Sequence, residues 1–111
     1  MRAVQRARER IQAIRASVAG FELLCSGTLS ERLMKCGKPN CRCASDPDAR
    51  HGPYYEWAHM RAGKPTHRYV SQQQALILRQ AIDNYRTVKK LLREWENNTE
   101  RLIDAAQPPQ T

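Results

Sequence analysis

The sequence predicts an α+β fold: an antiparallel pair of helices, short N-terminal and long C-terminal, flanks a small zinc-stabilised antiparallel β module. Three observations predict it. Apolar residues recur at helical spacing at both ends of the chain, strand-like residues lie between them, and cysteines cluster in the same middle region. The 111 residues suit a single domain, with an N-terminal helix (1–20), a zinc and β-hairpin module (21–70), a long helix (71–106) and a tail (107–111).

Apolar residues at alternating steps of three and four predict the first helix. They are Val4, Ala7, Ile11, Ile14, Val18 and Phe21, and Gly20 favours a stop. The long helix begins at a capping box formed by Ser71 and Gln74, and Pro108 follows its end. Its heptad seam is typical of a coiled coil and consists of Leu78, Ala81, Tyr85, Val88, Leu92, Trp95, Thr99, Leu102 and Ala106.

Two strands are predicted between the helices. They cover residues 54–60 and 66–70, and the Gly and Pro of RAGKP mark the turn between them. A further short strand is expected within 27–36, but its alternation does not settle which of its residues face the core.

The unequal lengths of the helices predict an interface. At 1.5 Å per residue the helices are roughly 27 and 52 Å long, so the short one covers only about the first half of the long one. An apolar stripe then lacks a partner within the chain: Leu92, Trp95, Leu102 and Ile103. We expect a homodimer or a helical protein partner there; the alternative is a helix that bends or frays after Asn97 and Asn98.

Residues 36–51 contain a candidate metal site. Cys36, Cys41, Cys43 and His51 follow the spacing C-x4-C-x-C-x7-H, and three cysteines with one histidine form a common structural zinc set. Neighbouring cations favour the thiolates that bind metal. The alternatives are a redox pair of Cys41 and Cys43, or buried cysteines beside a surface histidine. Cys25, in the apolar FELLC, is expected to be a core thiol.

The same pattern argues against an enzyme. Four protein ligands fill the coordination sphere of zinc and leave no position for a catalytic water, and the chain has no recognisable catalytic motif. The basic start has no apolar signal region, and no apolar run is long enough to span a membrane. We therefore expect a cytoplasmic, non-enzymatic protein, in a compartment where clustered cysteines favour metal over disulfides.

The net charge of +8 suggests a polyanionic partner, most simply nucleic acid, with DNA expected. The excess lies on 1–20, with five Arg against one Glu, and on 53–70, with three basic residues against one acidic. The candidate contacts are Arg2, Arg6, Arg10, Lys35, Lys38, Arg42, Arg61, Lys64, His67 and Arg68. An exposed aromatic among the hairpin cations would stack on a base. The alternatives are an ordinary solvated basic surface and aromatics that serve only the small core.

The motifs CGKPNCRC and HGPYYEW, followed by HRYV and a long helix with NYR, resemble an uncharacterised family of small bacterial proteins. The resemblance covers about residues 27–105. It implies genes that often neighbour transposases or other mobile-element genes, and it implies no established activity. The candidate zinc ligands match its motif and Cys25 does not.

Two functions follow from the sequence. The first is a zinc-binding accessory protein for nucleic acid, associated with a mobile element. The second is a structural adaptor or dimerisation protein that uses its long helix, with the basic charge serving only solubility.

Overall fold

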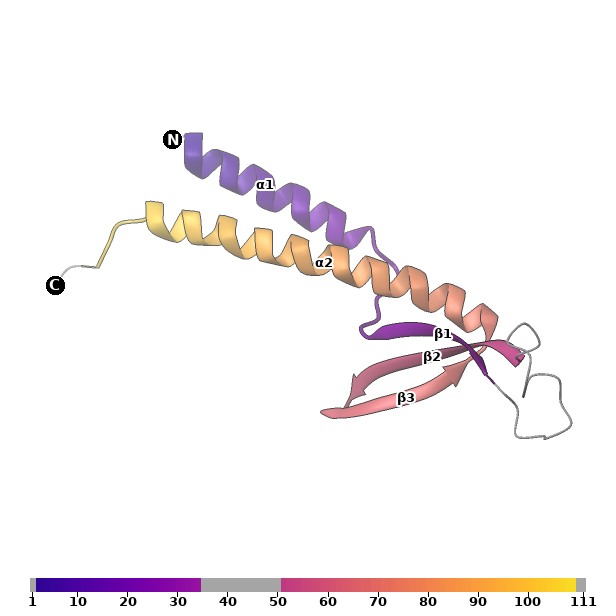
Figure 1. Ribbon diagram of the computed structural model, residues 1–111. Coiled ribbons are helices and arrows are strands. Elements are labelled where there is room, and N and C mark those ends of the chain that lie inside the picture. Colours follow the sequence, from indigo (N-terminus) through magenta and orange to yellow (C-terminus); the bar gives the residue numbers. More distant parts are fainter. Residues whose placement is uncertain (1, 35–50, 110–111) are drawn as a thin grey trace, which may run out of the picture. The chain divides into compact units, whose positions relative to one another are not determined.

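A computed structural model describes residues 2–34 and 51–109 (Figure 1). The elements follow the order α1 (Arg2–Ala19), β1 (Thr28–Met34), β2 (His51–Arg61), β3 (Lys64–Val70) and α2 (Gln72–Ala105). The predicted α+β class is therefore confirmed, with two helices and one three-stranded antiparallel sheet. Within the described ranges, neither helix has the length and apolarity that crossing a membrane requires.

The local signals in the sequence account for the helix ends. Ser71 and Gln74 form the predicted capping box: the Gln74 amide donates to Ser71 Oγ at 3.1 Å, and the Ser71 amide donates to Gln74 Oε1 at 2.8 Å. At the end of α1, the Gly20 amide donates to the Ser17 carbonyl at 3.1 Å. These bonds satisfy backbone groups that have no partner inside a helix.

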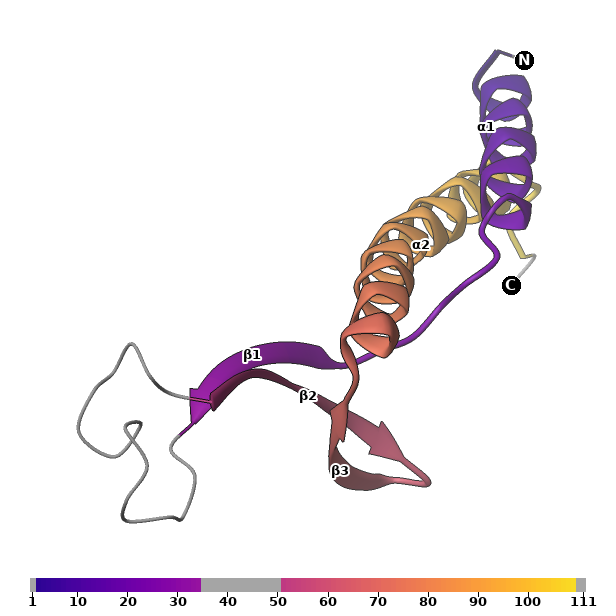
Figure 2. The same ribbon diagram turned by 90° about the vertical axis from the view of Figure 1, so that its right-hand side faces the viewer.

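The strands pair in the order β1-β2-β3 (Figure 2). Ala62 and Gly63 form the two-residue turn between β2 and β3 with φ of 52° and 78°, so both central residues have the positive φ of a type I′ hairpin. At the other end of the sheet, Met34 of β1 pairs with His51 of β2. The chain therefore leaves and re-enters the sheet at neighbouring points.

The contacts group the chain into two compact units, and α2 belongs to both. The first unit runs from Cys25 to Ile82 and contains the sheet and the start of α2. Its core consists of Val70, Ala75, Leu78 and Ile82, with Cys25, Leu29, Tyr55 and Trp57 packed against it. The expectation that Cys25 is a core thiol is thus confirmed.

The second unit consists of the residues up to Leu24 and those from Asp83 onward. In it, α1 runs antiparallel to the second half of α2, with Ala7, Ile14 and Val88 buried (Figure 1). The expectation that α1 covers the first half of α2 is wrong. The sheet occupies that half, and the segment after α1 runs beside the middle of α2, where Asn84 Nδ2 donates to the Leu23 carbonyl at 3.0 Å.

The predicted seam of α2 is followed only in part beyond Val88, where Trp95 and Leu102 are half-buried. Leu92 is 43% exposed, Leu91 is half-buried, and Asn98 is buried where the heptad pattern predicts Thr99. A single seam over the whole helix assumes one partner. Because α2 packs first on the sheet and then on α1, the buried face follows two partners instead of one.

Candidate functional site

The face of the sheet that points away from the core carries an exposed aromatic pair. Tyr54 and Tyr69 lie edge to face with ring centroids 6.4 Å apart, and they are 40% and 59% exposed. Arg32 of β1 pairs directly with Tyr54 of β2, so its exposed side chain projects from the same face. We call this side of the sheet the outer face; it consists of Thr28, Ser30, Arg32, Tyr54, Glu56, Ala58, Met60, Pro65, His67 and Tyr69.

His67 also lies on the outer face, next to a carboxylate. His67 Nδ1 lies 3.1 Å from Glu56 Oε1, and the Glu56 side chain is 17% exposed while that of His67 is 62% exposed. His67 therefore has a carboxylate partner on the neighbouring strand. The outer face also carries Arg32, which pairs across the strands with Tyr54.

The other predicted hairpin cations follow the helix-facing side of the sheet. Arg68 pairs with Trp57 across the strands, and its guanidinium lies 5.3 Å from the centroid of the indole ring. Arg61 and Lys64 flank the turn in the same row of side chains. Trp57 itself packs against the core, and its Nε1 donates to the Ser26 carbonyl at 3.0 Å.

The aromatic residues thus divide between the two roles that the sequence left open. Tyr55 and Trp57 serve the core, whereas Tyr54 and Tyr69 are exposed. The hairpin cations divide as well, between the outer face and the helix-facing side, so they do not form one continuous patch.

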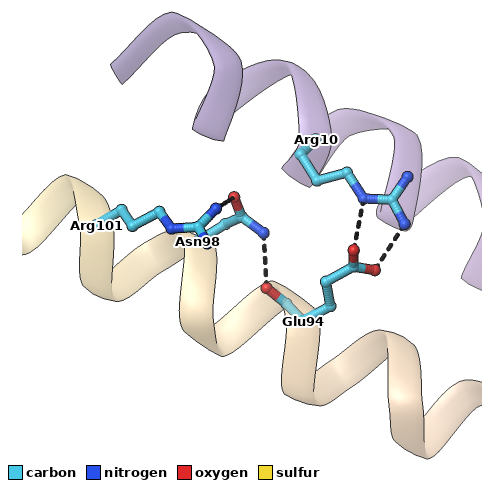
Figure 3. Close-up of polar contacts among 4 residues, drawn as sticks. All are labelled: Arg10, Glu94, Asn98 and Arg101. Atoms are coloured by element: carbon cyan, nitrogen blue, oxygen red, sulfur yellow. Dashed lines mark hydrogen bonds and ion pairs between the residues drawn. The ribbon is translucent and has the colours of Figure 1, made fainter. Parts of the chain in front are cut away.

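The three arginines spaced by four on α1 differ in their contacts. Arg10 binds the Glu94 carboxylate of α2 with two bonds, from Nε at 3.0 Å and from Nη2 at 2.6 Å (Figure 3). These hydrogen bonds lower the pKa of Glu94 and raise that of Arg10. Arg10 therefore joins the two helices, while Arg2 and Arg6 are exposed on α1.

Three of the predicted zinc ligands, Cys36, Cys41 and Cys43, lie outside the described residues, as do Lys35, Lys38 and Arg42. The fourth, His51, is the first residue of β2 and pairs with Met34, two positions before Cys36 in the sequence. Across the ranges that the structure describes, no group of three or more His, Cys, Asp or Glu is placed to hold a metal ion.

Three of the four predicted interface residues, Leu92, Trp95 and Ile103, line a surface groove on α2. A hollow of about 450 Å³ is lined by Leu92, Trp95, Glu96, Thr99, Glu100 and Ile103. Leu92 and Ile103 are 43% and 66% exposed, and Trp95 is half-buried. Leu102 is half-buried and does not line the groove.

Sequence reasoning missed Arg32 and Tyr54 as surface candidates. The signal that would have found them is the strand register, because the pairs Leu29 with Trp57 and Arg32 with Tyr54 assign each face of β1. Alternation within β1 alone is interrupted, because Glu31 follows Leu29 on the apolar side of the pattern.

A family model described as a domain of unknown function (DUF6788) matches residues 1–80, which include α1, the whole sheet and the start of α2. No curated protein and no solved structure matches the chain.

Proposed function

The chain belongs to the DUF6788 family, a domain of unknown function, and we propose that it is a small zinc-binding accessory protein for nucleic acid. The single observation that carries the proposal is the exposed pair of Tyr54 and Tyr69 beside Arg32 on the outer face. The net charge of +8 supports it. DNA is the nucleic acid that we expect, and the resemblance of the sequence suggests an association with a mobile element.

An exposed aromatic pair suits unpaired bases. A stacked base contributes about 1–3 kcal/mol per aromatic side chain, and the stacking tolerates any sequence because every base has a π face. Arg32 supplies a guanidinium beside the rings for the phosphate that connects two stacked bases. The outer face would therefore bind a single strand or an unpaired end in preference to a closed duplex.

Zinc would organise the segment between β1 and β2. The pairing of Met34 with His51 supports this, because it brings together the two flanks of the candidate ligand set. Cys36, Cys41, Cys43 and His51 would hold the ion as a closed structural site. Lys35, Lys38 and Arg42 lie in the same segment of the sequence, so the ion would also fix the cations of this loop for contact with phosphate.

The aromatic pair is tested with a fluorescent single-stranded oligonucleotide. We expect Tyr54→Ala plus Tyr69→Ala to weaken binding about tenfold or more, since the double variant has neither stacking side chain. Met60→Ala is the matched control, because Met60 is 60% exposed on the same face and offers no ring. Equal affinity of the double variant and the control, with sheet content unchanged, would assign the tyrosines no role.

The metal is tested by elemental analysis of the purified protein. We expect one zinc per chain, and a loss of zinc in Cys36→Ser, Cys41→Ser, Cys43→Ser and His51→Ala, because each removes one of four ligands. Cys25→Ser should keep the zinc, since Cys25 packs against the core. A metal-free wild type, or four ligand variants that retain zinc, would remove this part of the proposal.

The groove on α2 favours a second function, that of an adaptor or dimerisation protein. Exposed Leu92 and Ile103 border an apolar hollow on a helix surface, and exposed apolar surface often marks an interface. The two functions are compatible, because the groove lies on α2 and the aromatic pair lies on β2 and β3.

A further inference from the structure

A pocket of about 570 Å³ lies between α1 and the second half of α2. Ala3 and Ala7 supply small side chains on the α1 side, which leaves room between the helices. Three arginines line the pocket, Arg6 and Arg10 on α1 and Arg101 on α2. Its size is within the range typical of small-molecule sites.

The pocket has more positive than negative charge. Glu94 is the single carboxylate among its lining residues, and Arg10 binds both of its oxygens (Figure 3). Across the part of the chain that the structure describes, neither Arg6 nor Arg101 forms an ion pair. Two guanidinium charges therefore face one pocket, and the described residues give neither of them a carboxylate partner of its own.

A buried amide holds one of these cations in place. Asn98 is 2% exposed; its Nδ2 donates to the Glu94 carbonyl at 2.8 Å, and its Oδ1 accepts a hydrogen bond from Arg101 Nη1 at 3.2 Å (Figure 3). One bond anchors the amide to the backbone and the other orients the guanidinium. Asn97 lines the same pocket and adds a further amide.

We propose that this pocket binds a phosphate group through Arg6 and Arg101, with Arg10 and Glu94 forming its wall. The three arginines and one glutamate of the lining leave an excess of two positive charges, which complements a doubly charged phosphate, either a free phosphate or a monoester. The planar fork of Arg places two donors on the oxygens of a phosphate. The pocket shares no residue with the outer face of the sheet, so the proposal stands whether or not the tyrosines bind bases.

The test is calorimetric titration with inorganic phosphate, at constant ionic strength maintained with chloride. We expect binding by the wild type and at least a tenfold loss of affinity in Arg6→Gln and in Arg101→Gln, because each removes a charged hydrogen-bond donor. Arg8→Gln is the matched control: Arg8 is exposed on α1, loses the same charge and does not line the pocket. Arg6→Gln breaks no ion pair of the described residues, so its helicity should equal that of the wild type.

A second arm of the test identifies the source of the phosphate. Oligonucleotides of one sequence are compared with a 5′-phosphate and with a 5′-hydroxyl end. Tighter binding of the 5′-phosphate form, abolished in Arg101→Gln, supports the end of a nucleic acid; equal binding of the two forms, by a protein that binds inorganic phosphate, supports a free phosphate compound. No phosphate binding, or equal binding by wild type, Arg6→Gln, Arg101→Gln and Arg8→Gln, overturns the site.

Discussion

At the scale of single residues, Gly27 shows how closely the chain approaches the sheet before β1. Its φ is +114°, and a Cβ there would lie 2.4 Å from the Ala58 carbonyl oxygen and 2.7 Å from Trp57 Nε1. The neighbouring carbonyl of Ser26 accepts the Trp57 hydrogen bond. Only glycine combines this dihedral with this space, so Gly27 allows the chain to enter the sheet beside Trp57.

We expect Gly27→Ala to destabilise the protein by about 2 kcal/mol or more, because it adds backbone strain to a clash with backbone. Urea denaturation followed by Trp fluorescence measures the destabilisation. Gly20→Ala is the control: its Cβ would meet the Ser17 carbonyl oxygen at 3.4 Å, and its φ is not in the positive range. Equal stabilities of the two variants would contradict the role assigned to Gly27.

Some residue-level features were predictable from the sequence and others were not. The bonds of Ser71 with Gln74 were predictable, because capping depends on residues that are neighbours along the chain. The constraint on Gly27 and the burial of Asn98 were not, because both depend on partners distant in the sequence or on the packing of two helices.

At the scale of elements, α1 and α2 are joined by apolar packing and by one bidentate ion pair, Arg10 with Glu94. The hydrogen bonds from Arg10 are the main cause of the lowered pKa of Glu94; desolvation opposes them, and the charges of Arg10 and Arg101 lower the pKa further. A carboxyl with a lowered folded-state pKa stabilises the fold above its unfolded pKa, and this contribution disappears as the pH falls through the lowered value.

Glu94→Gln should therefore be slightly less stable than the wild type at pH 7, and the difference should vanish in acid. The decline begins near the ordinary glutamate pKa of about 4.3. Thermal unfolding followed by circular dichroism between pH 7 and pH 2 measures it, with Glu96→Gln as control, since Glu96 is exposed on the groove side of α2. A stability difference between Glu94→Gln and the wild type that is the same at every pH would show that the ion pair does not stabilise the fold.

For the strands, the sequence pattern predicted the hairpin but did not assign the faces of β1. Turn residues and β-favouring residues predicted the hairpin, and β2 and β3 extend beyond its predicted strands only at their ends. The faces of β1 were not assigned from the sequence, because Glu31 stands on the side of the alternation that Leu29 would place in the core. The pairing with β2 decides the faces, and pairing is a tertiary contact.

At the scale of the whole molecule, the groove on α2 is the surface most suited to a protein partner. The comparison of helix lengths predicted exposed apolar residues on α2 but placed α1 on the wrong half of that helix. Leu92 and Ile103 are exposed for another reason: they lie on a different face of α2 from the residues that contact α1. Glu96 and Glu100 rim the groove. A helix with an apolar seam flanked by basic residues would complement it.

If two chains pair through this groove, wild-type protein at tens of micromolar should sediment at twice the mass of the chain. Leu92→Glu plus Ile103→Glu should then sediment as a monomer with unchanged helicity, since both side chains are exposed in the single chain. Arg93→Glu is a control for added charge on the same helix, because Arg93 does not line the groove. A wild type that is monomeric at this concentration would exclude self-pairing.

The central claim is that the chain binds nucleic acid, and the salt dependence of that binding tests it most directly. Affinity for a single-stranded oligonucleotide is measured on the zinc-loaded protein at several salt concentrations. We predict measurable binding at low salt and a steep linear fall of log affinity with log salt. Arg32→Ala should make the slope shallower by up to about one unit, for the one phosphate that this outer-face cation would neutralise. An absence of binding even at low ionic strength would contradict the claim.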